Sequence, residues 1–173
     1  MILDQNLRLG NTGAITSAST YITGTSGTPD VVDLQSGTAY SATASGSLYT
    51  VAQGTQSRDI GEGRDLSVVF TVTTALAGAG TNATFQVVAS SSSTLASGNI
   101  VVGEVGVITA ANLTAGRQVV VRISQQQIAA TALRYLGAQV VTTGTFTAGV
   151  ISADVVMDIQ DGRTAYASGF TVA

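Results

Sequence analysis

The densest cluster of charged side chains lies at residues 58–65, where the sequence reads Arg-Asp-Ile-Gly-Glu-Gly-Arg-Asp. Its carboxylates recur at three-residue spacing, and several carboxylate oxygens are what a hard cation such as Ca²⁺ requires. The spacing differs from that of an EF-hand loop, however, and two arginines stand among the carboxylates and neutralise them. The cluster therefore favours a glycine-rich turn held by arginine–carboxylate pairs, or displayed to a partner, over a metal site. Its charged members are Arg58, Asp59, Glu62, Arg64 and Asp65.

Two further carboxylates, Asp154 and Asp158, fall on one face of a predicted strand over residues 150–159. Four strand residues separate them by about 13 Å, whereas the carboxylate pair of a glycosidase stands roughly 5–9.5 Å apart. They therefore form no catalytic dyad. We expect each to be solvated or to pair with a neighbouring arginine.

The side chains that most often carry catalysis are missing. The chain has no His and no Cys, and all seven cationic residues are arginines, so there is no Lys either. The commonest general base, the commonest zinc ligands and the Schiff-base amine are therefore absent. No nucleophile elbow, Walker loop or dinucleotide fingerprint occurs. We expect no enzymatic activity, no catalytic residue, no cofactor and no bound metal.

Charge is scarce along the whole chain. Charged residues make up 10% and hydrophobic residues 45% of the 173 residues, against about 25% charged in an ordinary domain. Either much of the surface is neutral and faces water, or much of it is covered in an assembly, which we favour because interface cores are depleted of charge. The net charge of −3 offers no basic surface for nucleic acid. No apolar run long enough for a membrane helix and no signal peptide are evident, so we expect synthesis in the cytoplasm.

The periodicity of apolar residues indicates an all-β protein. No helical pattern lasts three turns, whereas Val, Ile and Thr alternate with polar residues in several segments. We expect a two-sheet antiparallel sandwich or jelly roll of about eight strands, with a hairpin over 66–89, a polar loop over 90–98 and a bulged strand over 100–108. Residues 10–28 are expected to form an extended loop and 31–34 a short strand. The residues expected to face the core are Leu66, Val68, Phe70, Val72, Ala83, Phe85, Val87, Ala89, Val119, Val121, Ile123, Ile151, Ala153, Val155, Met157 and Ile159. Those expected to face outward are Ser67, Thr71, Thr73, Thr84, Gln86, Ser90 and Arg122.

Residues 134–160 are expected to form a closing hairpin of two strands. Phe146 and Ile151 cannot share one face by strict alternation, so a turn or bulge at Ala148–Gly149 is needed to reset the register. On this interpretation residues 142–149 form a loop at the end of the sheet, and the regular core strand begins at residue 150.

The chain length fits one domain over residues 1–173. Outside the expected sandwich core we distinguish an N-terminal arm at 1–10, a long excursion at 36–57 and a C-terminal tail at 161–173. The excursion is rich in small polar residues with interspersed tyrosines. Loops of this length are usually functional or disordered.

A series of short motifs in a fixed order resembles the small capsid cement, or decoration, proteins of tailed bacteriophages. Each motif is unspecific alone, and together they cover most of the chain. The motifs are the start Met-Ile-Leu-Asp-Gln-Asn-Leu, Val-Val-Asp-Leu at 31–34, Arg-Asp-Ile-Gly-x-Gly-x-x-Leu at 58–66, Arg-Tyr-Leu at 134–136, Gly-Thr-Phe-Thr-Ala-Gly at 144–149 and Tyr-Ala-Ser-Gly-Phe-Thr-Val at 166–172.

This resemblance implies a jelly-roll protein without catalytic activity that binds the outer face of the major capsid protein shell. Such a protein bridges neighbouring capsomers and resists the pressure of packaged DNA, and we expect a homo-oligomer, a dimer or a trimer, on the virion exterior. We expect the arm, the 58–65 turn and the tail to make the contacts. The candidate contact residues are Leu3, Asp4, Leu7, Arg8, Arg58, Asp59, Glu62, Arg64, Asp65, Tyr166 and Phe170.

A second class of protein remains open, a β-sandwich adhesin or fibre-head domain that binds a receptor or a glycan. The strand 150–159 with the motif before it also resembles the end of pilin subunits. Pilins, however, carry a signal peptide and usually a disulfide, and a glycan-binding jelly roll usually offers Trp, which this chain lacks. Glycan binding that survives the loss of capsid binding would favour this class.

Overall fold

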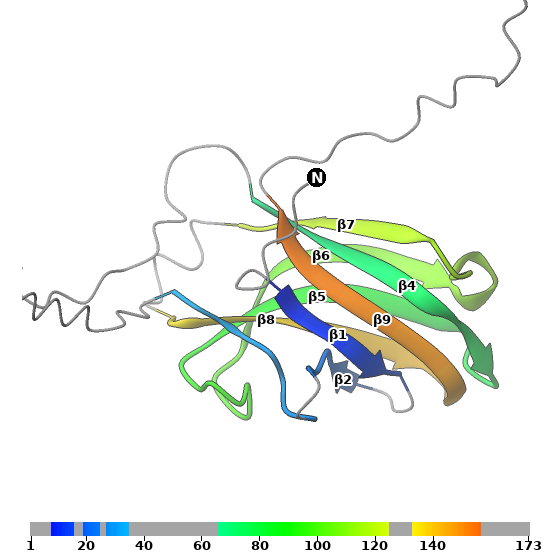
Figure 1. Cartoon of the computed structure of the whole chain (residues 1–173), viewed down its shortest axis with the longest axis horizontal. Helices are drawn as coiled ribbons and strands as arrows, with labels where there is room; N and C mark the ends of the chain where they lie inside the picture. The colour runs from blue at the N-terminus through cyan, green and yellow to red at the C-terminus, as the bar shows by residue number, and fades with distance from the viewer. Residues whose placement is uncertain (1–7, 16–18, 25–26, 35–65, 125–132, 157–173) are drawn as a thin grey trace, which may run out of the picture.

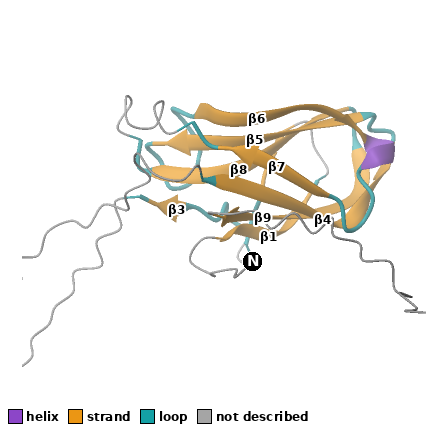
Figure 2. Ribbon diagram, turned by 90° about the horizontal axis from the view of Figure 1, so that it is seen from above, coloured by secondary structure: helices purple, strands orange, loops and turns teal. Residues whose placement is uncertain are grey.

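Two antiparallel β-sheets packed face to face make up the described part of the chain. A computed structural model describes residues 8–15, 19–24, 27–34, 66–124 and 133–156. Figure 2 shows the sheets as two layers, with β5, β6 and β8 in one and β1, β4 and β9 in the other. The expected all-β sandwich is confirmed.

The strands vary from two to twelve residues in length. In chain order, the elements are β1 (Arg8–Ala14), β2 (Ser19–Tyr21), β3 (Val32–Asp33), β4 (Ser67–Gly78), β5 (Asn82–Ser90), β6 (Ile100–Thr109), the short 3₁₀ turn η2 (Ala110–Asn112), β7 (Gln118–Arg122), β8 (Tyr135–Thr143) and β9 (Phe146–Val156).

The strand order is that of a jelly roll. One sheet runs β1-β9-β4-β7 and the other β2-β8-β5-β6, with β3 pairing to β8 beyond β2. Because β2 and β3 share one edge position along β8, the sandwich has eight strand positions in two sheets of four. The coloured chain in Figure 1 crosses repeatedly from one sheet to the other.

Both predicted hairpins are wrong. In the 66–89 segment β4 and β5 belong to different sheets, and in the 134–160 segment β8 and β9 do as well. β4 pairs instead with β7 and β9, while β5 pairs with β6 and β8. Alternation shows which face of a strand is buried, but strands facing each other across a core have the same alternation as hydrogen-bonded neighbours.

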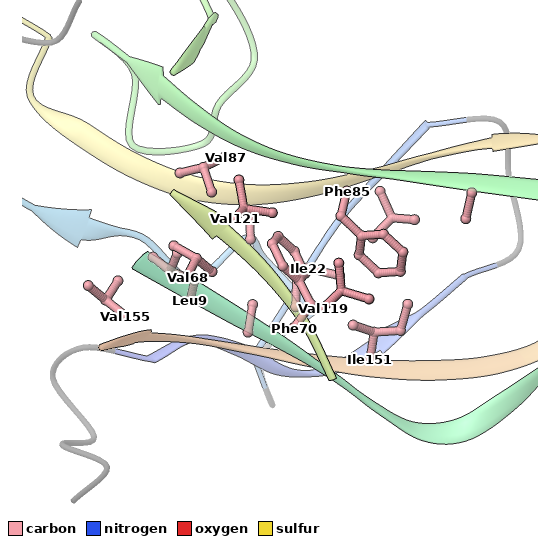
Figure 3. Close-up of a cluster of buried hydrophobic side chains, with 14 of the residues drawn as sticks. Leu9, Ile22, Val68, Phe70, Phe85, Val87, Val119, Val121, Ile151 and Val155 are labelled. Carbon is pink, nitrogen blue, oxygen red and sulfur yellow. The ribbon is translucent and has the colours of Figure 1, made fainter. Parts of the chain in front are cut away.

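The inner faces of the two sheets form one hydrophobic core. Phe70 of β4 and Phe85 of β5 meet between the sheets, with ring centroids 5.2 Å apart and planes at 66°, and Figure 3 shows them among the surrounding valines and isoleucines. This edge-to-face contact is a favoured geometry for aromatic pairs. The predicted inward residues of 66–72, 83–89, 119–123 and 151–155 all belong to this core or pack against it. Met157 and Ile159 lie outside the described residues.

The predicted bulge beside Gly149 is present, but the predicted loop is not. The pairing of β4 with β9 shifts register between Val72 and Gly78, opposite residues 146–151. These shifts allow Phe146 and Ile151 both to be buried. The strand nevertheless starts at Phe146, so the expected loop over 142–149 is wrong, since bulges bend a strand without ending it.

Residues 10–28 also differ from the expectation of an extended loop. Most of β1 and all of β2 lie there, and Thr23 forms an isolated bridge with Pro29. The segment has few large side chains, so its pattern was weak. Two of them, Ile15 and Ile22, are fully buried.

The outer edges of the sheets are irregular. Pairing of β1 to β9 and of β6 to β5 is interrupted by register shifts, and the remaining edge strands have five residues or fewer. Bulged and short edges disfavour the addition of a strand from another molecule. At one corner the two sheets meet closely, where the amide of Ser124 donates to the carbonyl of Val102 at 2.6 Å. Gly103 lies against the backbone of Arg122 there, in a space that a Cβ would fill.

Candidate partner-contact end

The connections of the sandwich differ between its two ends. At one end, which we call the short-loop end, the connections are 15–18, 79–81, 110–117 and 144–145. At the opposite end β1 begins, β3 ends, β4 begins, β7 ends, β8 begins and β9 ends. The register places Arg8 beside Asp154, Ser67 beside Val156 and Arg122, and Asp33 beside Tyr135. We call this second end the segment-bearing end.

Nearly all the candidate contact residues belong to stretches that join the sandwich at the segment-bearing end. Residues 1–7 join at Arg8, residues 35–65 at Leu34 and Leu66, and residues 157–173 at Val156. Ten of the candidates lie outside the described residues, namely Leu3, Asp4, Leu7, Arg58, Asp59, Glu62, Arg64, Asp65, Tyr166 and Phe170. The excursion 36–57 and the tail 161–173 lie there as well. The fold thus brings together the attachment points of stretches that are far apart in sequence.

Arg8, the one candidate within the described residues, forms an ion pair at this end. Its Nε donates to Oδ1 of Asp154 at 3.2 Å, across 146 residues of sequence. The side chain of Asp154 is 10% exposed and that of Arg8 is 35% exposed. Of the two expectations for Asp154, pairing with an arginine is therefore the one that holds. The pair fastens the edge strand β1 to β9, while Asp158 lies outside the described residues.

A second ion pair stands where the chain leaves β3 and enters β8. Arg134 donates from Nε and Nη2 to the two carboxylate oxygens of Asp33, at 2.9 and 2.7 Å. The hydrogen bonds that Arg134 donates to Asp33 raise the pKa of Arg134, and desolvation opposes this rise only in part. The guanidinium also lies 5.0 Å from the ring centroid of Tyr135. Backbone bonds from Leu34 to Arg134 and from Arg134 to Ser90 complete the junction.

Sequence reasoning missed this junction. It singled out the Arg-Tyr-Leu motif at 134–136 but assigned no partner to the arginine. Asp33 lies 101 residues away, and a separation of that length leaves no local pattern. The one available signal was that each residue sits at the end of a predicted strand.

The β5–β6 connection, residues 91–99, is the described loop at the segment-bearing end. Leu95 is fully buried and adopts a left-handed conformation with φ +56°, which is rare for such a residue. It packs on Gly137, where a Cβ would overlap the leucine side chain. Asn99 donates through Nδ2 to the Leu95 carbonyl at 2.7 Å and to the Tyr21 hydroxyl at 2.6 Å. The loop is therefore tied to the outer face of the sheet.

Two residues expected to face outward, Ser67 and Ser90, are buried. Ser90 is fully buried because loop 91–99 folds over it. Its hydroxyl donates to the Ser97 carbonyl at 2.9 Å and accepts the Ser92 amide at 3.0 Å. The alternation along β5 predicts correctly that the Ser90 side chain points to the outer face of the sheet. It cannot show that a loop covers that face.

Charged groups of the described residues concentrate at the segment-bearing end. Both ion pairs lie there, and so does Arg122, which is exposed and has no ion-pair partner among the described residues. Within the same ranges, the short-loop end carries a single charged residue, Arg117. The described residues contain no group of three metal-ligating side chains, and none of their helices is long and apolar enough to span a membrane. Most of the charged side chains in the described ranges therefore lie at the segment-bearing end.

The fold and the site define a jelly-roll β-sandwich whose termini and longest connection join one charged end. The chain belongs to the Bbp16 family, whose model matches residues 16–155. A search of curated proteins gives no match.

Proposed function

We propose that the protein is a structural virion component, a capsid cement or decoration protein of a tailed bacteriophage. It binds the outer surface of the major capsid protein lattice and stabilises the shell against the internal pressure of DNA. Its role is mechanical and involves no catalysis. It acts from the exterior of the capsid after synthesis in the host cytoplasm.

The observation that carries this proposal is that the attachment points of the candidate contact stretches lie at one end of a jelly-roll sandwich. Residues 1–7, 35–65 and 157–173 all join the described body there. The Bbp16 match over 16–155 also contains four of the six motifs on which the resemblance to cement proteins rests. A body of this kind can present several contact segments to one surface.

In this mechanism the sandwich core supplies rigidity, and other parts of the chain make the contacts with the capsid. The core holds the strands together, and the Arg8–Asp154 and Arg134–Asp33 pairs fasten the places where contact stretches join. Several weak contacts made by one rigid body add through effective concentration, so no single interface has to be strong. Repeated over a lattice, such contacts resist the separation of neighbouring subunits.

The direct test adds purified protein to bare, expanded phage heads. We expect saturable, stoichiometric addition measured by co-sedimentation, together with a higher temperature of head disruption. A variant that lacks residues 161–173 should bind more weakly, because it removes Tyr166 and Phe170. Heads that neither retain the protein nor gain heat resistance would exclude the function, whereas full retention of the deletion variant would exclude only the role of the tail.

We also propose that the protein is a homo-oligomer, a dimer or a trimer. The low content of charged residues, 10% of the chain, supports extensive covered surface. The irregular sheet edges favour contacts through loops or faces over strand addition. Sedimentation equilibrium of the free protein measures its stoichiometry, and a monomer at all accessible concentrations would contradict this part.

A further inference from the structure

We infer that the molecule sits on its partner in one fixed polarity. Loop 91–99 and Arg122 touch the protein shell, and the short-loop end points into solvent. This inference rests on the proposed function and adds a described contact surface to it. Neither loop 91–99 nor Arg122 is among the contact residues that the sequence indicated.

The two ends are too far apart to touch one surface together. β4 has twelve residues and β9 has eleven, and both run from one end to the other. At about 3.3 Å per residue, the ends are separated by roughly 35 Å. A partner that these stretches hold close to their attachment points therefore meets the described residues of the segment-bearing end.

Loop 91–99 is held in one conformation before any partner binds. The left-handed backbone at Leu95 is strained for a residue other than glycine, and such strain persists only where the surroundings enforce it. Burial of Leu95 on Gly137 and the hydrogen bonds of Asn99 supply that enforcement. A loop that is ordered before binding loses little conformational entropy when it docks. The side chains that it exposes are small and neutral, namely Ser91, Ser93, Thr94, Ala96, Ser97 and Asn99.

Arg122 adds an exposed charge to the segment-bearing end. It ends β7 and lies opposite Ser67, on the outer face of its sheet. Because it is exposed and has no ion-pair partner among the described residues, it can bind a carboxylate of another protein through its planar fork. The surface that fits this end is therefore a protein surface with neutral polar groups and a carboxylate at its rim.

The short-loop end has the opposite character. Its longest turn is closed on the sandwich by the Gly116 amide, which donates to the Val72 carbonyl at 2.8 Å, and by the Arg117 amide, which donates to the Thr114 carbonyl at 3.1 Å. Thr114 and Arg117 are exposed there. These residues can change without loss of core packing, so they provide matched controls.

The test compares two pairs of substitutions in the full-length protein. Arg122→Glu and Arg117→Glu make the same change in net charge at the last residue of β7 and at the residue before its first, about 17 Å apart along the strand. Ser93→Arg and Thr114→Arg place the same bulky cation on loop 91–99 and on the short-loop turn. Unchanged thermal melting and circular dichroism show that each variant is folded, and co-sedimentation with expanded heads gives its affinity.

We expect Arg122→Glu and Ser93→Arg to weaken binding by about tenfold or more, and Arg117→Glu and Thr114→Arg by less than about twofold. Equal effects at both ends, no effect at either, or a larger effect at the short-loop end would overturn the polarity while leaving the proposed function intact. If the unmodified protein does not bind the heads, the proposed function fails and the polarity fails with it.

Discussion

Arg134 binds Asp33 through two hydrogen bonds, of 2.9 and 2.7 Å, and so joins the end of β3 to the start of β8. The two side chains remain partly exposed, at 43% and 23%. At this junction the chain departs into residues 35–65 and returns from residues 125–132. The pair thus holds together the two strands from which these stretches leave the sandwich.

Replacing Arg134 should lower the melting temperature by a small amount, because a partly exposed ion pair is screened by solvent. Arg134→Lys should recover only part of the loss, since Lys lacks the planar fork that contacts both carboxylate oxygens. High salt should reduce the difference between Arg134→Ala and the unmodified protein. A difference that grows with salt would contradict this account.

The same pair should show no pH dependence on the basic side of neutrality. Contact with Asp33 raises the already high pKa of Arg134. A raised pKa in the folded state gives stability that is fully present below the unfolded pKa and is lost only as the pH rises through the folded one. Both values lie far above neutrality, so the stability difference between Arg134→Ala and the unmodified protein should stay constant from pH 7 to pH 9. Urea denaturation at several pH values measures it.

Gly103→Ala should destabilise the sandwich, because the new Cβ would overlap the carbonyl oxygen of Arg122. Accommodating it requires the corner between β6 and β7 to open, at a cost of about 1–3 kcal/mol. Gly106→Ala is the matched control on the same strand, since no atom lies within 4 Å of the added Cβ. Chemical denaturation should separate the two variants, and equal stabilities would show that the corner is not tightly packed.

Phe70 and Phe85 should be coupled, because their rings meet edge to face between the sheets. Phe85→Ala should cost about 3–5 kcal/mol. A double-mutant cycle with Phe70→Leu and Phe85→Leu should give an interaction energy of about 0.5–1.5 kcal/mol. Val107→Ala serves as a control, since Val107 is 69% exposed and should change stability by less than about 0.5 kcal/mol. Additive single effects would exclude direct contact of the rings.

Leu95→Ala should loosen loop 91–99 more than it loosens the sandwich. The substitution removes the side chain that packs on Gly137 but keeps the unfavourable backbone conformation. Amide hydrogen exchange should therefore speed up in residues 91–99 while β8 keeps its protection. Ala96→Ser, at the next and exposed position, is the control. Equal acceleration in β8 would show that Leu95 supports the whole sheet.

Local pattern was sufficient for the fold class and for the inward faces of the strands. Residues such as Val68, Phe70 and Val72 alternate with polar neighbours, and alternation of period two reflects burial of one face of a strand. The missing His, Cys and Lys likewise bear directly on chemistry, because composition alone limits the catalytic groups available. The family resemblance came from the order of the short motifs.

Only the tertiary structure decided which strands pair and which charged side chains meet. The sequence of β4 alternates in the same way whether β4 pairs with β5 or faces it across the core. The hairpins were therefore predicted wrongly. Arg8 with Asp154 and Arg134 with Asp33 are separated by 146 and 101 residues, and Leu95 is buried because its loop turns back over the sheet. The sequence by itself determined which side chains avoid water, because that preference is local. Which of them meet depends on how the whole chain closes into two sheets.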